Sequence, residues 1–313
     1  MIWGEKFRPK NFSEFFGQDK VVERIRAFVK QKNIPHMLFS GPAGIGKTTI
    51  SLIIAKELYG KEWQQNFLEL NSSDERGIDV IRNKVKDFAR TKTIGNFPFK
   101  IILLDECDSL TKEAQQALRR TMENYTNTCR FILSCNYSSK IIDPIQSRCI
   151  VFHFKPLERD AIGKIIDNIT KNEKLKIEKN VADALLEISG GDVRRIINIL
   201  QSCAAVNKNI TKDLIYETVS VAHPKEVKEV LELAISGNFI KSREKLLDTM
   251  LKYGLSGLDI IRQIQKETWE LKIKDEDKVK MVEKCGEIEF RMVEGSDEYL
   301  QLEALLASFT LIK

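Results

Sequence analysis

The run GPAGIGKT matches the pattern GxxxxGK[ST], a glycine-rich loop that can hold phosphate groups. Its members are Gly41, Pro42, Ala43, Gly44, Ile45, Gly46, Lys47 and Thr48, and we group Thr49 with them. Glycines let the backbone curl so that its N–H groups face phosphate oxygens. Lys47 is expected to neutralise β- and γ-phosphates, and Thr48 to ligate Mg²⁺. The competing interpretation is a glycine-rich turn that matches the pattern by chance.

A second signal is the run of aliphatic residues from Ile101 to Leu104, which ends in Asp105 and Glu106. It predicts a central strand with two acids at its carboxyl end, which is the edge where open α/β sheets bind ligands. Asp105 would hold Mg²⁺, directly or through water, and Glu106 would orient and deprotonate an attacking water. An isolated strand that ends in Asp-Glu is more often a solvated strand end, so the argument depends on the phosphate loop beside it.

These groups need a scaffold, and the chain predicts one from alternating strands and helices. Short apolar runs predict strands at residues 37–40, 66–70, 101–104, 130–135 and 150–154. Helical periods fall at residues 19–31, 48–58, 78–90 and 111–124. Such alternation indicates a parallel sheet with crossover helices. The fold class is therefore α/β, with the phosphate loop between the first strand and the following helix.

After Pro156 the helical period dominates and strand signals are absent. Residues 157–200 predict two or three short helices, with a Gly190-Gly191 turn before the last of them. His223-Pro224 is a plausible linker because a residue before proline leaves the helical region. We expect three domains: an α/β domain at 1–155, a helical domain at 156–222 and an all-α domain at 223–313.

Composition sets the outer limits on function. The 313 residues carry a net charge of +5, which suggests a nucleic-acid partner only if the positive charge collects on one face. The six cysteines form no CxxC pair, and with three histidines a metal held by protein side chains alone is not expected. The N-terminus has charges where a signal peptide needs an apolar core, and no apolar run could span a bilayer. We therefore expect an intracellular protein, cytoplasmic or, in a eukaryote, nuclear.

Several longer stretches resemble one known family. WGEKFRPK, NSSDERGIDVIR, QQALRRTME and FILSCNYSSKIIDPIQSRC are very similar to the small subunits of replication factor C, the AAA+ sliding-clamp loader, and look closest to its archaeal branch. The match runs from Trp3 to about Arg195. It implies an AAA+ ATPase domain, a helical lid that carries a sensor 2 residue, and a C-terminal collar domain for oligomerisation. The implied activity is hydrolysis of ATP, with Mg²⁺, coupled to the loading of a clamp on DNA.

The resemblance assigns further roles residue by residue. Asn136 matches sensor 1, although it could simply cap a strand-end turn. Arg148 matches the arginine finger, which acts on the nucleotide of a neighbouring subunit; the ordinary alternative is a surface arginine in a local ion pair. Arg194 matches sensor 2, with Arg195 as the fallback. The segment Phe7, Arg8 and Pro9 resembles the part that wraps adenine, against the alternative of a loosely ordered tail.

The implied macromolecular contacts are DNA and the clamp. Arg82, Lys86 and Arg90 fall on one helical face, and Lys112 opens the next helix. In the family such helices follow the backbone of duplex DNA, but a charge run is usually only a solvated face. A patch near Phe88 and Ala89 resembles the clamp-contacting region. The implied partners are a large loader subunit and other small subunits, expected as a heteropentamer, a PCNA-type sliding clamp, and primer–template DNA. No membrane partner is expected.

Other functions stay open at this level. A Holliday-junction helicase motor would share the nucleotide site, and a checkpoint or alternative loader would use the same core with another large partner. A scaffold with a vestigial ATP site is disfavoured by the intact Lys47, Thr48, Asp105 and Glu106. The bacterial gamma-type loader subunits carry a four-cysteine zinc module soon after the phosphate loop. The chain has no cysteine before Cys107, so that module is absent.

Overall fold

The computed structural model describes residues 2–74, 77–219 and 222–311, so Glu75 and Arg76 of the NSSDERGIDVIR stretch lie outside it. The chain divides into two compact units, Met1–Gln201 and Ser202–Lys313. The first contains a five-stranded sheet in the order β2-β3-β4-β1-β5, and every paired strand is parallel. Its strands are β1 (Met37–Ser40), β2 (Phe67–Asn71), β3 (Lys100–Asp105), β4 (Cys129–Cys135) and β5 (Ile150–His153). Each strand lies within a residue or two of its predicted range.

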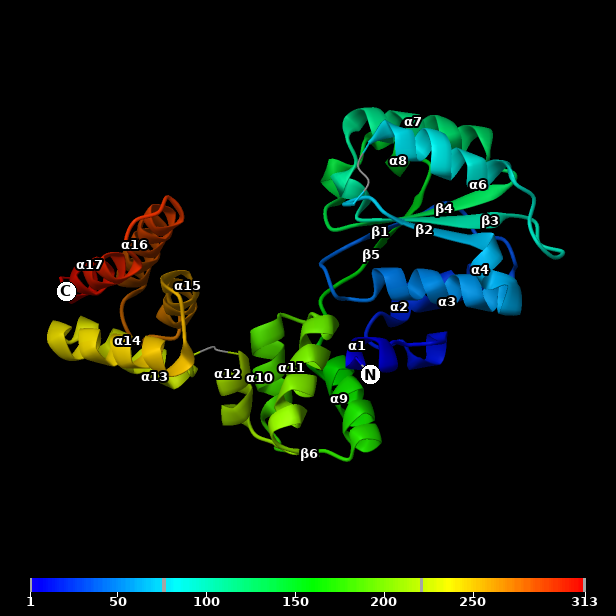
Figure 1. The fold of residues 1–313 in the computed structure, drawn as a ribbon. Helices are drawn as coiled ribbons and strands as arrows, with labels where there is room; N and C mark the ends of the chain where they lie inside the picture. Colours follow the sequence, from blue (N-terminus) through cyan, green and yellow to red (C-terminus); the bar gives the residue numbers. More distant parts are fainter. Residues whose placement is uncertain (1, 75–76, 220–221, 312–313) are drawn as a thin grey trace. The chain divides into compact units, whose positions relative to one another are not determined.

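Helices cover both faces of this sheet (Figure 1). On one face lie α2 (Asp19–Lys30), α3 (Lys47–Tyr59) and α4 (Trp63–Asn66), and on the other α6 (Lys86–Arg90), α7 (Lys112–Asn124) and α8 (Asp143–Gln146). Alternate residues of one strand serve the two layers: Met37 and Phe39 pack in the cluster with α2 and α3, and Leu38 packs in the cluster with α7. Successive side chains of a strand point to opposite faces, so a strand covered on both sides is apolar throughout.

The helix predicted at 78–90 is interrupted. A short turn α5 (Ile78–Val80) leads into a π-helical turn (Ile81–Val85) before α6. π-helical turns appear mostly as single insertions in α-helices, and the apolar period alone does not reveal them. Short elements complete this part of the unit: α1 (Trp3–Lys6) and the 3₁₀ turns Phe12–Glu14, Gly60–Glu62, Cys107–Ser109 and Ser138–Lys140.

Three helices follow β5: α9 (Arg159–Glu173), α10 (Val181–Ser189) and α11 (Val193–Val206). The predicted Gly190-Gly191 turn lies between α10 and α11, and both glycines have positive φ. Two-residue strands also occur in this region, at β6 (Lys176–Ile177) and β7 (Asn209–Ile210), where the sequence carries no strand signal. Segments this short leave no period of alternation to detect.

The second unit is helical apart from β7. It contains α12 (Lys212–Val219), α13 (Pro224–Ile235), α14 (Phe239–Tyr253), α15 (Gly257–Thr268), α16 (Asp275–Val293) and α17 (Glu298–Thr310), and a single apolar cluster joins α13 to α17. His223 has extended backbone and caps α13, whose first residue is Pro224. Proline suits that position because it needs no N–H partner there. Among the described residues, no helix is both long and apolar enough to cross a membrane.

Candidate functional site

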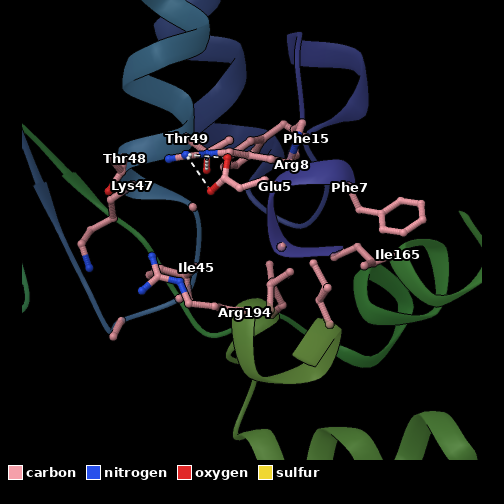
Figure 2. A pocket seen from close by; sticks show the side chains of 18 of the residues that line it. Glu5, Phe7, Arg8, Phe15, Ile45, Lys47, Thr48, Thr49, Ile165 and Arg194 are labelled. Atoms are coloured by element: carbon pink, nitrogen blue, oxygen red, sulfur yellow. Dashed lines mark hydrogen bonds and ion pairs between the residues drawn. The ribbon is translucent and has the colours of Figure 1, made fainter. Parts of the chain in front are cut away.

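A cavity of about 440 Å³ opens at the carboxyl edge of the sheet, beside the phosphate loop. Its walls come from the N-terminal segment, the loop before α3, the ends of β3 and β4, and helices α9 and α11 (Figure 2). Within it lie most of the residues singled out from the sequence: Phe7, Arg8, Pro9, Ala43, Gly44, Ile45, Gly46, Lys47, Thr48, Thr49, Asp105, Glu106, Asn136 and Arg194. The volume is in the range of small-molecule sites. Gly41 and Pro42 precede this wall and contribute carbonyls to Lys47.

The phosphate loop has the backbone shape that its glycines permit. Gly44 and Gly46 have φ of +72° and +96°. A Cβ on Gly46 would lie 2.6 Å from Cζ of Phe15, and one on Gly44 would lie 1.8 Å from Oδ1 of Asp192. Both positions therefore need glycine for conformation and for space. The loop then leads directly into α3, whose first residue is Lys47, so the helix N-terminus faces the cavity.

Lys47 is only 8% exposed, and its ammonium lies among oxygen atoms. Its Nζ donates to the carbonyls of Gly41 (2.5 Å) and Pro42 (2.6 Å) and to Oδ1 of Asn136 (3.2 Å). Burial lowers the pKa of Lys47, and nearby charges, Asp105 first, oppose that effect. The ammonium is thus buried against neutral carbonyls, and nearby carboxylates favour its charged form. A buried positive charge of this kind is suited to a polyanionic ligand.

Thr48 and Asp105 form a pair of oxygen ligands. Thr48 donates its hydroxyl hydrogen to Oδ2 of Asp105, while Oδ1 of Asp105 accepts the N–H of Glu106 (3.0 Å). A hydroxyl and a carboxylate side by side fit Mg²⁺, which prefers oxygen and keeps most of its waters or phosphate ligands. In the described parts of the chain, no group of three or more His, Cys, Asp or Glu could hold a metal. Two such ligands leave most of the coordination sphere of a magnesium ion open to water or phosphate oxygens.

Glu106 has an uncommon backbone. Its φ is +52°, in the left-handed region that residues other than glycine seldom occupy. Its side chain is exposed and lines the cavity, and its backbone N–H is held by Asp105. Non-glycine residues in this region concentrate at functional sites, where the surrounding structure holds them against strain. The turn therefore places Glu106 on the open side of the cavity.

Asn136 follows the adjacent strand β4 and meets Lys47 through its side-chain oxygen. The backbone N–H groups of Asn136 and Tyr137 both donate to Oδ2 of Asp108 (3.3 Å each). Sequence reasoning missed Asp108, whose only signal was its place two residues after Glu106. It also missed the apolar lining from Phe15, Ile165, Ile169 and Ile197, since nothing in the pattern separates those residues from the core.

The helical segment contributes Arg194 to the cavity. In the view of Figure 2 its guanidinium points to the side of the pocket on which Lys47 lies. Arg195 does not line the cavity, and its N–H donates to Oδ1 of Asp192 at the start of α11. The N–H of Val193 donates to the carbonyl of Gly44 (3.1 Å). The helix that carries Arg194 is thus joined to the phosphate loop by a backbone hydrogen bond.

The N-terminal segment is ordered against the site. Nε of Arg8 donates to Oγ1 of Thr49 (3.1 Å), and the Arg8 guanidinium lies 3.4 Å from a carboxylate oxygen of Glu5 (Figure 2). Lys6 pairs with Glu173 of α9 (2.5 Å). These contacts exclude the alternative of a loose tail for this segment.

Arg148 does not line the cavity of its own chain. It follows α8, donates from NH1 to the Pro144 carbonyl (2.6 Å) and forms an ion pair with Glu123 of α7. Glu123 also pairs with Arg119 (3.1 Å). Of the residues predicted to do chemistry, Arg148 is the one that the structure keeps apart.

The four basic residues predicted to contact DNA lie on α6, α7 and the preceding π-helical turn. Arg82, Arg90 and Lys112 are exposed, while Lys86 is half-buried and Nε of Arg90 donates to the Tyr125 hydroxyl (3.1 Å).

The clamp-contact prediction was wrong for Ala89, which is completely buried. Its partner in that prediction, Phe88, is half-buried with the Lys100 ammonium over its ring at 4.4 Å. The helix turns its small residue to the core, as apolar packing requires.

Comparison with known proteins places this architecture. Three family models match consecutive ranges: "ATPase family associated with various cellular activities (AAA)" at residues 37–157, "RFC1-like, AAA+ ATPase lid domain" at 159–217, and "Replication factor C C-terminal domain" at 222–308. Among solved structures, the RuvB Holliday junction branch migration motor of Thermotoga maritima has a TM-score of 0.57 at 20% identity, covering 73% of this chain and 79% of that chain. At that identity the likeness shows a shared AAA+ fold alone.

Similarity in sequence is much stronger and extends over almost the whole chain. The replication factor C small subunit of Methanococcus vannielii is 53% identical over 311 residues, which are 99% of each chain. That of Methanocella arvoryzae is 54% identical, covering 98% of this chain and 96% of its own. That of Archaeoglobus fulgidus is 51% identical, with the same coverage. The chain is an AAA+ ATPase that binds nucleotide, and it belongs to the replication factor C small-subunit family.

Proposed function

We propose that this chain is a small subunit of a clamp loader, in which binding and hydrolysis of ATP drive the opening of a ring-shaped clamp and its loading onto primed DNA. One observation carries the proposal: Lys47, Thr48, Asp105, Glu106 and Asn136 come from three segments of the chain and meet in one cavity at the carboxyl edge of the sheet. Full-length similarity to archaeal loader subunits supports the coupling of this site to a clamp.

In the proposed site the loop from Gly41 to Thr49 holds the triphosphate, with Lys47 on its β- and γ-phosphates. Thr48 and Asp105 hold Mg²⁺, which when bound neutralises charge on the transferring phosphoryl group. Glu106 orients the attacking water and accepts its proton, and Asn136 places that water against the γ-phosphate. Phe7, Arg8 and Pro9 form the wall beside the base. Arg194 contacts the γ-phosphate, so the angle of the lid depends on the nucleotide.

Arg148 acts on the nucleotide of a neighbouring subunit in this proposal. It is absent from the cavity of its own chain and its side chain is 35% exposed, so it is available at a subunit contact. A guanidinium stabilises charge that develops on the phosphoryl group, and supplying it from a neighbour makes hydrolysis depend on assembly. Bound ATP then favours the assembled, clamp-opening arrangement only by its higher affinity for that arrangement. After hydrolysis the γ-phosphate no longer links the phosphate loop of one subunit to Arg148 of its neighbour, and clamp and DNA are released.

We further propose the division into an ATPase domain (1–155), a lid (156–222) and a collar (223–313), which the ranges of the three family models support. The partners proposed are a large loader subunit and further small subunits in a heteropentamer, a PCNA-type clamp and primer–template DNA. Arg82, Lys86, Arg90 and Lys112 are the proposed DNA contacts. The exposure of Arg82, Arg90 and Lys112 supports this assignment.

The test separates the two halves of the nucleotide site. Lys47→Ala should abolish ATP binding, measured by calorimetric titration of the purified chain. Arg148→Ala should leave that binding unchanged and lower hydrolysis in the assembled loader by about 10³-fold. Arg159→Ala is the matched control, because Arg159 is also an exposed arginine paired with a carboxylate, that of Asp183. Equal loss of ATP binding in the first two variants would contradict the assignment of Arg148 to a neighbour's site.

A further inference from the structure

Asp108 lies between the two strand ends that carry the proposed catalytic groups. It belongs to the 3₁₀ turn Cys107–Ser109, two residues after Glu106 at the end of β3. β3 and β4 are adjacent and parallel, with Leu104 opposite Leu133, so the segments that follow them leave the sheet side by side. Asp108 is therefore close to Asn136, which follows β4.

The contacts of Asp108 are directed at the backbone of this neighbouring segment. Its Oδ2 accepts the N–H groups of both Asn136 and Tyr137, each at 3.3 Å. One carboxylate oxygen thus holds two consecutive peptide groups and fixes the direction in which the Asn136 side chain leaves the chain. That side chain in turn accepts a hydrogen bond from Lys47. Both bonds are long, but they share a charged acceptor and hold two consecutive peptide groups, so together they restrain rotation of the segment.

The other oxygen of Asp108 is a cost to stability. Oδ1 is buried and has no hydrogen-bond partner among the described residues. A buried carboxylate oxygen without a partner destabilises the fold, so simple turn formation is a poor explanation for an acid here. The same charge acts on the ammonium of Lys47, for which Asp108 is one of the favourable neighbours. A side chain that costs stability, that holds the backbone of Asn136 and whose charge acts on Lys47 points to a role in the reaction.

We infer that Asp108 is a positioning residue for ATP hydrolysis, which holds Asn136 in place against Lys47 and the γ-phosphate by accepting two backbone N–H bonds. The inference rests on the proposed role of Asn136 and extends it. Asp108 does not touch the substrate in this scheme, and its positioning effect acts through Asn136. Its removal should therefore slow the chemical step and leave nucleotide affinity nearly unchanged.

The experiment is a double-mutant cycle on the loader assembled from full-length chains. Steady-state kcat and KM for ATP are measured for Asp108→Ala, Asp108→Asn, Asn136→Ala and the Asp108→Ala/Asn136→Ala pair, with calorimetric ATP binding for each. We expect Asp108→Ala to lower kcat about tenfold with KM within about twofold, because small misplacements of reacting groups have effects of this order or larger. Asp108→Asn keeps a neutral acceptor and should fall between wild type and alanine. The paired variant should be no slower than Asn136→Ala alone, since the effect acts through that residue.

Asn207→Ala serves as the control for loss of a side-chain acceptor, because Asn207 accepts the N–H of Asn209 (2.9 Å) and does not line the cavity. It should leave kcat unchanged. Wild-type kcat in Asp108→Ala, or additive effects of the two alanine substitutions, would overturn the inference. A general folding defect would lower ATP binding in Asp108→Ala and in Asp108→Asn, and that result would also overturn it. If Asn136→Ala itself retains full activity, the proposed role of Asn136 fails instead, and the two failures are thereby distinguished.

Discussion

His36 should make the stability of the nucleotide-binding unit fall in mildly acidic solution. The residue precedes β1 and is 8% exposed. Its Nδ1 accepts the N–H of Phe131 (3.0 Å), and its Nε2 is buried with no hydrogen-bond partner in the described parts of the chain. The ring is therefore held neutral, because a proton on Nδ1 would remove the bond to Phe131. Burial, and after it the positive charge of Arg130, together lower the pKa of His36 from 6.5 to about 4.

The sign follows from comparing the two states. The unfolded chain takes up a proton near pH 6.5, whereas the folded chain does so only near pH 4, so acid stabilises the unfolded chain between these values. The stabilising effect is complete above pH 6.5 and is lost as the pH falls through about 4. A tenfold difference in proton affinity corresponds to about 1.4 kcal/mol, so the whole loss is about 3 kcal/mol, of which about 2 kcal/mol is reached at pH 5.

The assay is urea unfolding followed by circular dichroism at pH 7.5 and pH 5, on wild type and His36→Asn. Asparagine keeps an acceptor for the Phe131 N–H but does not titrate, so the free energy of unfolding of the variant should depend less on pH. We expect the wild type to lose about 2 kcal/mol more than the variant over this interval. His153→Asn is the control, because His153 is exposed at the end of β5. The same pH dependence in wild type and His36→Asn would refute the reasoning.

Two further predictions concern the nucleotide site and the arginine finger. Gly46→Ala should abolish ATP binding, measured by calorimetry, and destabilise the fold by about 3 kcal/mol. The added methyl group would clash with the ring of Phe15, and alanine disfavours the left-handed backbone at this position. Gly60 follows the last residue of the same helix and also has positive φ, but the space around an added Cβ is open. Gly60→Ala should therefore destabilise the fold by about 1 kcal/mol and leave ATP binding intact. Equal effects of the two substitutions would contradict the steric argument. Glu123→Gln should lower kcat of the assembled loader about threefold at unchanged KM, because the ion pair with Glu123 orients Arg148. An unchanged kcat in Glu123→Gln, with Arg148→Ala impaired, would show that the pair has no part in orienting the finger.

Much of the nucleotide site was predictable because its signals are local. The phosphate loop needs glycine where φ is positive, and the strand before it needs apolar residues on both faces, so both leave a pattern in consecutive residues. The acids after β3 were predictable for the same reason. Two predictions for residues 78–90 were only partly right. The helical period does not distinguish a continuous helix from one with a π-helical turn, and the family resemblance suggested a contact patch near Ala89, which is buried.

Residues far apart in sequence meet for reasons that no local pattern records. Asn136 reaches Lys47 only because β4 lies beside β1 in the sheet, and Asp108 reaches Asn136 only because β3 lies on the other side of β4. Arg194 enters the same cavity because α11 begins with a backbone bond to the phosphate loop. Each of these contacts depends on the order of strands and on the packing of helices at long range.

The amino-acid sequence alone specified which chemical groups are available: a loop shaped for phosphate, an ammonium, a hydroxyl, two acids and a candidate arginine finger. It did so because backbone freedom and apolar alternation are properties of neighbouring residues. Long-range packing settled which of these groups share a cavity, and it keeps Arg148 outside. Strand order and helix packing depend on burial of the whole core, to which residues far apart in the sequence contribute together.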